Sequence, residues 1–295
     1  MTALLPRYCE LDHLGVIGVA GPDAQSFLQG QLTCDVNTLS LNSSTYGSYC
    51  NPKGRVLATF LLWHSAGGYF LQLPAGLREA IQKRLALYVL RAKVSVTDAG
   101  AGGTTLGLAG QDTAARIERV LGAVPRAEHA LAQTPEATAI RLPLERYLVL
   151  AARDTAPAIL AKVAQDAAAA APEYWDWLDI RAGVPAITAP TQGEFVPQML
   201  NQDLIGGLSF SKGCYPGQEI VARMHFLGRL KSRLYLASVA AEPGNGPRPG
   251  DKLYSPDLGE QASGTIVNAA RSCVKRSPDL CTDSSSNPSN GSTIP

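Results

Sequence analysis

The sequence lacks the features that mark membrane, secreted and polyanion-binding proteins. It has no run of about 18 or more apolar residues, which excludes a transmembrane helix, and residues 1–7 do not form the charged-then-apolar pattern of a secretion signal. Its 26 basic and 25 acidic residues nearly cancel, which argues against a surface built to grip a polyanion. Six cysteines without a CxxC pair exclude a disulfide scaffold. These absences predict a soluble cytoplasmic protein with no membrane contact and no direct nucleic-acid binding.

Catalytic and metal-binding motifs are also missing. There is no GxxxxGK[ST] phosphate-binding loop, no GxSxG nucleophile elbow and no HExxH zinc motif. The four histidines are far apart, and the cysteines at positions 9, 34, 50 and 214 have no paired spacing. We therefore expect no metal site in the isolated protein. A metalloenzyme or a serine hydrolase would have to be assembled entirely from distant residues.

The first two-thirds of the chain contain an internal repeat. Residues 17–24 (IGVAGPDA) are echoed by residues 106–113 (LGLAGQDT), and each copy reads as a strand that turns directly into a helix. A second echo follows in the same order, because residues 69–73 and 147–150 each read as a strand that precedes an amphipathic helix. Two copies of a ferredoxin-like βαββαβ unit account for this pattern. Coincidence remains the alternative, since strands that end at glycine are common.

The last third of the chain changes character. Residues 164–171 are rich in alanine and are predicted to finish a helix that Pro172 ends. Short strand-like runs separated by proline and glycine turns predict a small antiparallel β-barrel; they are residues 234–239, 252–254 and 263–267. After residue 270 almost nothing apolar is left to bury, so the remaining residues are expected to be disordered.

One segment concentrates polar side chains beside glycines. Residues 212–219 read Lys-Gly-Cys-Tyr-Pro-Gly-Gln-Glu. Glycines permit positive φ and a close approach of the backbone to a ligand, and a helix is predicted to begin near Gly217. Cys214 lies between Lys212 and that helix, and a cation and a helix N-terminus both favour the thiolate, so this cysteine is the candidate reactive thiol with Lys212 beside it. The alternative is a tight loop around a buried, inert cysteine.

Positive charge gathers in the same region. Residues 212–233 contain five basic residues and one acid, Glu219. This excess suits the phosphate or polycarboxylate tail of a ligand, and it equally suits a solvated strand edge. The sequence leaves both interpretations open.

The octapeptide at residues 212–219 resembles the K-G-C-[YF]-x-G-Q-E signature of the YgfZ family. Further segments resemble family segments in the same order; they are residues 15–36, 51–55, 88–94 and 181–185. Members of this family are folate-binding proteins that support iron–sulfur enzymes and are structurally related to the aminomethyltransferase (T-protein) of the glycine cleavage system. The resemblance implies an α+β fold, a three-domain ring of two partly interleaved ferredoxin-like units and a C-terminal antiparallel β-barrel around a central opening that holds folate.

The repeat and the resemblance together predict four segments. They are residues 1–100 for the first ferredoxin-like unit, 101–230 for the second unit with the octapeptide loop, 231–270 for a small barrel with either a complete or an incomplete set of strands, and 271–295 for a disordered tail.

The resemblance also implies which residues bind a tetrahydrofolate. Gln198 stands where the aminomethyltransferases carry a pterin-binding glutamate, so a neutral amide would make this contact. The implied folate-binding residues are Gln198, Asn201, Gly213, Tyr215, Gly217, Gln218, Glu219, Arg223 and Arg55. The aminomethyltransferases carry an aspartate shortly after the glycines that align with residues 53–55, whereas residues 56–60 (VLATF) contain no acid. Aminomethyl transfer by the T-protein mechanism is therefore not expected.

Three functional hypotheses follow. The favoured one is a monomeric folate-binding accessory protein for iron–sulfur cluster assembly or repair, which indirectly supports tRNA modification. Its partners would be iron–sulfur assembly or client proteins, with Cys214 supplying a redox or cluster-related thiol and no stably bound metal. The second is a folate-dependent one-carbon transferase of the aminomethyl type. The third is a binding module whose basic segment contacts RNA or an acidic protein.

Overall fold

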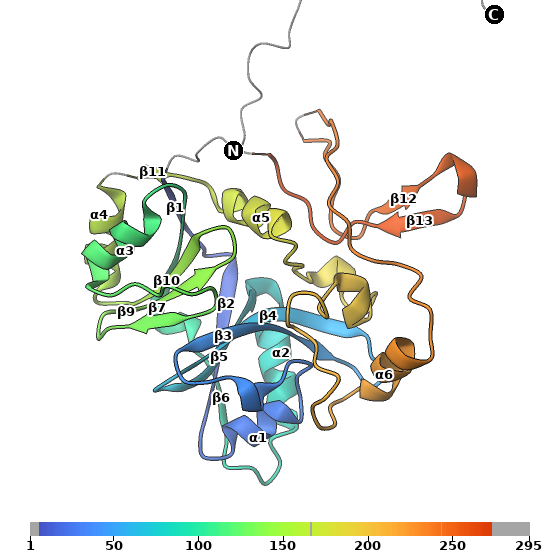
Figure 1. Ribbon diagram of the computed structural model, residues 1–295, viewed down its shortest axis with the longest axis horizontal. Helices are drawn as coiled ribbons and strands as arrows, with labels where there is room; N and C mark the ends of the chain where they lie inside the picture. Colours follow the sequence, from blue (N-terminus) through green and yellow to red (C-terminus); the bar gives the residue numbers. More distant parts are fainter. Residues whose placement is uncertain (1–5, 166, 243, 273–295) are drawn as a thin grey trace, which may run out of the picture.

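Two β-sheets and the helices that cover them make up most of the structure, a computed structural model that describes residues 6–165, 167–242 and 244–272 (Figure 1). The five-stranded sheet has the order β3-β4-β5-β2-β6 and is antiparallel throughout. Its strands are β2 (Leu14–Ala20), β3 (Ser43–Cys50), β4 (Val56–Ser65), β5 (Gly68–Pro74) and β6 (Ser95–Asp98). The helices between these strands are α1 (Ala24–Gln29), the short 3-10 helix η1 (Val36–Thr38) and α2 (Ala75–Leu87).

The second sheet has six strands in the order β11-β1-β7-β10-β9-β8. They are β1 (Arg7–Glu10), β7 (Gly103–Ala109), β8 (Leu131–Gln133), β9 (Ala137–Leu142), β10 (Arg146–Ala152) and β11 (Ala168–Ala169). The associated helices are η2 (Gly100–Gly102), α3 (Thr113–Leu121) and α4 (Ala156–Ala164).

Both sheets are built by the same path of the chain. A strand and a helix are followed by a three-stranded meander, a second helix and a last strand, and the third meander strand pairs back with the first strand of the unit. This shared path agrees with the internal repeat in the sequence. Each unit carries one strand more than the predicted βαββαβ, because the chain between the two helices forms three strands instead of two.

The first strand of the chain is separated from the unit that follows it. β1 pairs antiparallel with β7 and parallel with β11, so it lies inside the six-stranded sheet. The thiol of Cys9 on β1 also donates to the carbonyl oxygen of Gly107 on β7 at 3.7 Å. The chain therefore starts in one unit, builds the other and then returns.

The alternation of side chains along the strands produces three layers of core. Ile17 and Leu71 of the five-stranded sheet face the core beneath α1 and α2, whereas Val149 of the six-stranded sheet faces α3 and α4. The remaining faces of both sheets share one core, to which Trp63 and Leu148 contribute. Fully burying a large apolar side chain is worth about 1.5–3 kcal/mol, so this shared core holds the two units together.

Helix α5 (Pro172–Arg181) closes one side of the shared core. Its Trp175 ring packs onto Gly107, where a Cβ would collide with the ring, so this approach requires glycine. Arg146 is fully buried, lies 4.8 Å from the centre of the Trp175 ring and pairs with Asp179 at 2.7 Å. The predicted helix end at Pro172 is wrong, because α4 ends at Ala164 and Pro172 begins α5.

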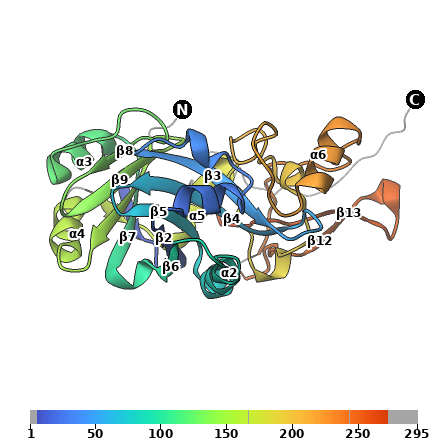
Figure 2. The same cartoon turned by 90° about the horizontal axis from the view of Figure 1, so that it is seen from below.

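The predicted β-barrel is not seen among the described residues of the C-terminal third. That region contains one two-stranded ribbon, β12 (Lys252–Tyr254) with β13 (Ala262–Thr265), and the 3-10 helix η5 (Pro256–Leu258) between them. Residues 234–239 form no strand, and Tyr235, Leu236 and Val239 are exposed. Figure 2 shows the ribbon and α6 (Gln218–Phe226) on the opposite side of the sheets from α3 and α4.

The sequence predicts a disordered tail at residues 271–295. From residue 273 on, this tail lies outside the residues that the structure describes. Within the described part of the chain, no helix has the length and apolar character needed to span a membrane.

Candidate functional site

The octapeptide loop is anchored to the first unit by Lys212. The side chain is buried, and its ammonium group donates to the carbonyl oxygens of Leu32 at 2.5 Å and Cys34 at 2.8 Å. It also lies 5.3 Å from the centre of the buried Tyr215 ring. Burial lowers the pKa of Lys212 to about 8, since desolvation disfavours the charged form. These bonds go to backbone carbonyls and not to Cys214, so the predicted pairing of Lys212 with the thiol is not the arrangement found.

Two glycines join this loop to the turn at residues 51–55. Gly217 has φ +82°, and a Cβ there would lie 2.5 Å from both the carbonyl oxygen of Asn51 and the backbone nitrogen of Gly54. Gly54 has φ +69°, and a Cβ there would lie 3.1 Å from the carbonyl oxygen of Gly217. Both positions therefore favour glycine for their conformation, and Gly217 also requires it for space. Two motifs that are distant in the sequence meet at this junction.

The side chain of Asn51 shapes the turn itself. Its Oδ1 accepts from the backbone amides of Lys53 at 2.9 Å and Arg55 at 3.1 Å, which closes an Asx-type turn. The Arg55 guanidinium donates to the carbonyl oxygen of Glu194 at 2.7 Å. Arg55, one of the implied folate ligands, is thus engaged with the backbone of the segment that leads to Gln198.

Helix α6 starts directly after Gly217, as the sequence predicts. Gln218 reaches back along the loop, where its Nε2 donates to the carbonyl oxygen of Lys212 at 3.4 Å. Cys214, Glu219 and Arg223 are exposed. A Cβ at Gly213 would meet nothing within 4 Å, so this part of the loop is open. The structure thus places the thiol on the outer side of the loop.

Gln198 connects α6 to the preceding 3-10 helix, η4 (Pro197–Leu200). Its side chain is buried, and Nε2 donates to the carbonyl oxygen of Val221 in α6 at 2.7 Å. Its Oε1 is buried without a hydrogen-bond partner among the described residues. Asn201 follows with φ +55°, and its Nδ2 donates to the carbonyl oxygen of Leu234 at 2.9 Å.

The basic excess of this region is partly neutralised inside the fold. Arg233 binds both carboxylate oxygens of Asp203, at 2.6 and 2.8 Å, and also donates to the carbonyl oxygen of Gln198 at 3.2 Å. Lys212 is buried, as described above. Arg223, Arg229 and Lys231 remain exposed. The local surface is therefore less basic than the residue count suggests.

A small cavity of about 60 Å³ lies in the shared core, beside the segment that follows η4. Three polar side chains that line it have a buried atom without a hydrogen-bond partner among the described residues: Tyr46 through Oη, Gln72 through Nε2 and Gln202 through Oε1. Asp179 also lines the cavity, and one terminal nitrogen of its partner Arg146 is likewise unpartnered within the described chain. Leaving a buried polar group unsatisfied costs about 1–3 kcal/mol, so such a cluster points to a polar ligand or bound water.

Sequence reasoning missed these cavity residues. Gln72 offered one signal, since it is a polar residue inside the apolar strand run of residues 69–73. Of the predicted site residues, Gln198, Tyr215, Gly217 and Gln218 come together around α6.

The four cysteines that the structure describes divide into two kinds. Cys9, Cys34 and Cys50 are buried, and desolvation raises the pKa of each thiol to about 12, whereas Cys214 is exposed. Among the described residues, no group of three or more histidine, cysteine, aspartate or glutamate side chains is arranged to hold a metal ion.

Known proteins share this fold, and some are about one-third identical to this chain in sequence. Residues 7–155 match the model of the GCVT N-terminal domain family. A crystal structure of the glycine cleavage system aminomethyltransferase T from Bartonella henselae has the same fold at a TM-score of 0.62 and 17% identity, over 76% of this chain and 64% of that one. The chain is thus a GCVT-domain protein with a mixed α+β fold that resembles the T-protein.

The closer relatives narrow the family. The chain is 34% identical to the tRNA-modifying protein YgfZ of Colwellia psychrerythraea, over 85% of this chain and 76% of that protein. It is 32% identical to the YgfZ protein of Serratia proteamaculans, over 88% of this chain and 79% of that protein. The chain belongs to the YgfZ family of tRNA-modifying proteins.

Substituting Gly217 by alanine should destabilise the protein by at least about 1–2 kcal/mol, which is the cost of a left-handed backbone at a residue with a Cβ. The clash with Asn51 and Gly54 adds to this cost. Gly213→Ala is the matched control, with an expected change within about 0.5 kcal/mol. Urea denaturation measures both free energies of unfolding. Equal losses in the two variants would contradict the described junction.

The buried position of Lys212 predicts a pH dependence. Its pKa is about 8 in the folded protein against 10.5 ordinarily, so between these values the unfolded chain keeps a proton that the folded chain has released. The contribution of this residue to stability therefore rises with pH across that window. The free energy of unfolding of the wild type, minus that of Lys212→Met, should increase from pH 8 to pH 10. A difference that falls over this range would contradict a buried Lys212.

Proposed function

We propose that this chain is a folate-binding accessory protein for iron–sulfur cluster assembly or repair, and that it supports tRNA modification through enzymes that depend on such clusters. The observation that carries the proposal is the cluster of unpartnered polar atoms in the shared core. One member of this cluster, Gln202, belongs to the segment that leads into the octapeptide loop, and that loop exposes Cys214. Family membership supports the link to tRNA modification, since the relatives are named as tRNA-modifying proteins.

The polar atoms of the cavity suit the edge of a pterin ring. That edge presents an amide and an amino group, which need acceptors as well as donors. Gln72 Nε2 is a donor, Gln202 Oε1 is an acceptor, and the Tyr46 hydroxyl can act as either. Ligand pockets for whole small molecules measure about 300–1,000 Å³, so the cavity as it stands has room for a ring edge only.

The remainder of a folate would need the space outside the cavity. Gln202 lies one turn beyond Gln198, whose buried Oε1 also lacks a partner within the described chain. Gln198 in turn binds α6, so a ligand that engaged both glutamines would lie against the octapeptide loop. This arrangement would couple folate binding to the position of Cys214.

The proposed role of Cys214 is to offer a thiol to a partner. Thiolates are the usual protein ligands of iron–sulfur clusters, and Cys214 is the exposed cysteine among those that the structure describes. No group of three or more potential metal ligands is found among the described residues, so the partner protein would supply the remaining ligands. A transient bridge of this kind needs an accessible loop with a firm anchor, and Lys212 and Gly217 supply the anchor.

One observation favours the alternative, a folate-dependent transferase of the aminomethyl type. Asp179 brings a carboxylate to the cavity lining, although residues 56–60 carry no acid. Its ion pair with the fully buried Arg146 argues for a structural role, because removing one member of a buried pair leaves an uncompensated charge. Turnover of methylene-tetrahydrofolate with an amine acceptor by the intact chain would establish the transferase instead.

Tetrahydrofolate should bind the wild type with measurable heat in titration calorimetry. Gln202→Leu should weaken binding roughly fivefold, because one lost hydrogen bond is worth about 1 kcal/mol. Tyr46→Phe should do the same. Tyr69→Phe is the control, since Tyr69 is buried in the core on the other face of the same sheet. Absence of heat with the wild type would overturn the folate proposal.

Cys214→Ser should leave folding and folate binding intact while abolishing the support of iron–sulfur enzymes. The test is complementation of a deletion strain under oxidative stress, scored by the activity of several such enzymes. Ser211→Ala, at the exposed position directly before the loop, is the control and should complement fully. Full complementation by Cys214→Ser would rule out a role for the thiol.

A further inference from the structure

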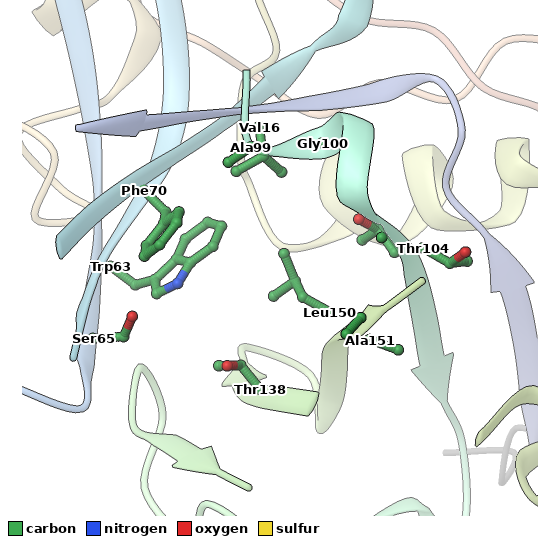
Figure 3. Close-up of a pocket in the computed structure, with 13 residues that line it drawn as sticks. Val16, Trp63, Ser65, Phe70, Ala99, Gly100, Thr104, Thr138, Leu150 and Ala151 are labelled. Carbon is green, nitrogen blue, oxygen red and sulfur yellow. The ribbon is translucent and has the colours of Figure 1, made fainter. Parts of the chain in front are cut away.

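A second and larger cavity, of about 230 Å³, lies between the two sheets at the other end of β4 from the turn at residues 51–55 (Figure 3). Strand β4 runs from Val56, next to the octapeptide junction, to Ser65, which lines this cavity. The cavity shares no lining residue with the polar cavity beside Gln202. It is therefore a separate feature of the shared core.

The five-stranded sheet provides an aromatic wall. Trp63 on β4 is the register partner of Phe70 on β5, and their rings are stacked with centroids 5.4 Å apart and planes 16° from parallel. Ser65 follows Trp63 by two residues and so lies on the same face of the sheet. Figure 3 shows both rings at one side of the cavity, with Ser65 beside them.

The six-stranded sheet provides the opposite wall. Leu150 on β10 is the register partner of Thr105 on β7 and of Thr138 on β9, so the three side chains form a row on one face of the sheet. Leu150 and Thr138 lie across the cavity from the rings in Figure 3. The end of the cavity is closed by Val16, Ala99 and Gly100.

The polar character of this cavity comes from hydroxyl groups. The side chains of Ser65, Thr105 and Thr138 make no hydrogen bond to any residue that the structure describes. None of the described lining residues is charged. An anionic or cationic group would find no compensating charge among the described lining residues, whereas a neutral ring with a polar edge would gain both stacking and hydrogen bonds.

We propose that this cavity binds a neutral, planar, bicyclic nitrogen heterocycle of the nucleobase type, presented as a free base or a nucleoside. An apolar cavity of about 150 Å³ is enough for benzene, so the larger volume here suits a bicyclic ring. The ring would lie against the Trp63–Phe70 wall, and its nitrogen and oxygen atoms would meet the hydroxyls of Ser65 and Thr138. This site does not depend on the folate site proposed above, since the two cavities are lined by different residues.

Adenosine and guanosine are the probes, with ribose as the negative control, and binding is measured by titration calorimetry on the intact chain. At least one nucleoside should bind, and ribose should not. Leu150→Trp fills the cavity and should weaken nucleoside binding by at least tenfold while leaving tetrahydrofolate binding unchanged. Gln202→Leu, in the other cavity, should leave nucleoside binding unchanged.

Thr138→Val keeps the volume of the side chain and removes one hydroxyl, so it tests the site even if the tryptophan variant does not fold. It should weaken nucleoside binding about threefold or more, through the lost hydrogen bond. Absence of binding by both nucleosides overturns the proposal, and so does full affinity in a folded Leu150→Trp. If the tryptophan variant does not fold, full affinity in Thr138→Val overturns it. Loss of tetrahydrofolate binding in a folded Leu150→Trp, with no effect of Gln202→Leu, would assign this cavity to folate and would also overturn the proposal.

Discussion

The contact between the backbones of Gly54 and Gly217 is the constraint on which the candidate site depends. It brings the turn after β3 against the start of α6, at a distance that a side chain at Gly217 would not permit. Once α6 is held there, Gln198 can bind the carbonyl oxygen of Val221, which fixes η4. Lys212 completes the attachment by inserting its ammonium group among carbonyl oxygens of the first unit. The loop is therefore firmly attached on its inner side and open on the outer side, where Cys214 lies.

Local features of the sequence predicted the parts of this arrangement that depend on neighbours in the chain. The start of α6 at Gly217 follows from a glycine before an apolar-periodic run, and the two-unit path follows from strands that end at glycine before helices. The place of β1 in the other unit's sheet could not be predicted in this way, because its pairing with β7 is between distant segments. The role of Lys212 was misjudged for a related reason: being two residues from Cys214 in sequence does not determine where a long side chain points.

The predicted strands of the C-terminal third show the limits of apolar pattern alone. Residues 234–239 form a short strand-like run in the sequence, yet no described strand pairs with them, and Tyr235 is 84% exposed. A strand needs a partner for its backbone groups, so the pattern does not suffice without one. The cavity atoms were missed for the opposite reason. Tyr46, Gln72 and Gln202 come from three separate segments, and only the packing of the two sheets reveals that their polar atoms are left without partners.

The most direct test of this account is the rate at which each cysteine of the folded protein is alkylated, resolved by peptide mass spectrometry. If Lys212 and Gly217 hold the loop as described, Cys214 is modified first of the four cysteines that the structure describes, and Cys9, Cys34 and Cys50 react at a comparable rate only after denaturant is added. Cys34 is the most informative comparison, because its carbonyl oxygen accepts from Lys212 and its side chain is buried. Alkylation of Cys34 in the native protein as fast as that of Cys214 would contradict the anchored loop and, with it, the proposed presentation of the thiol.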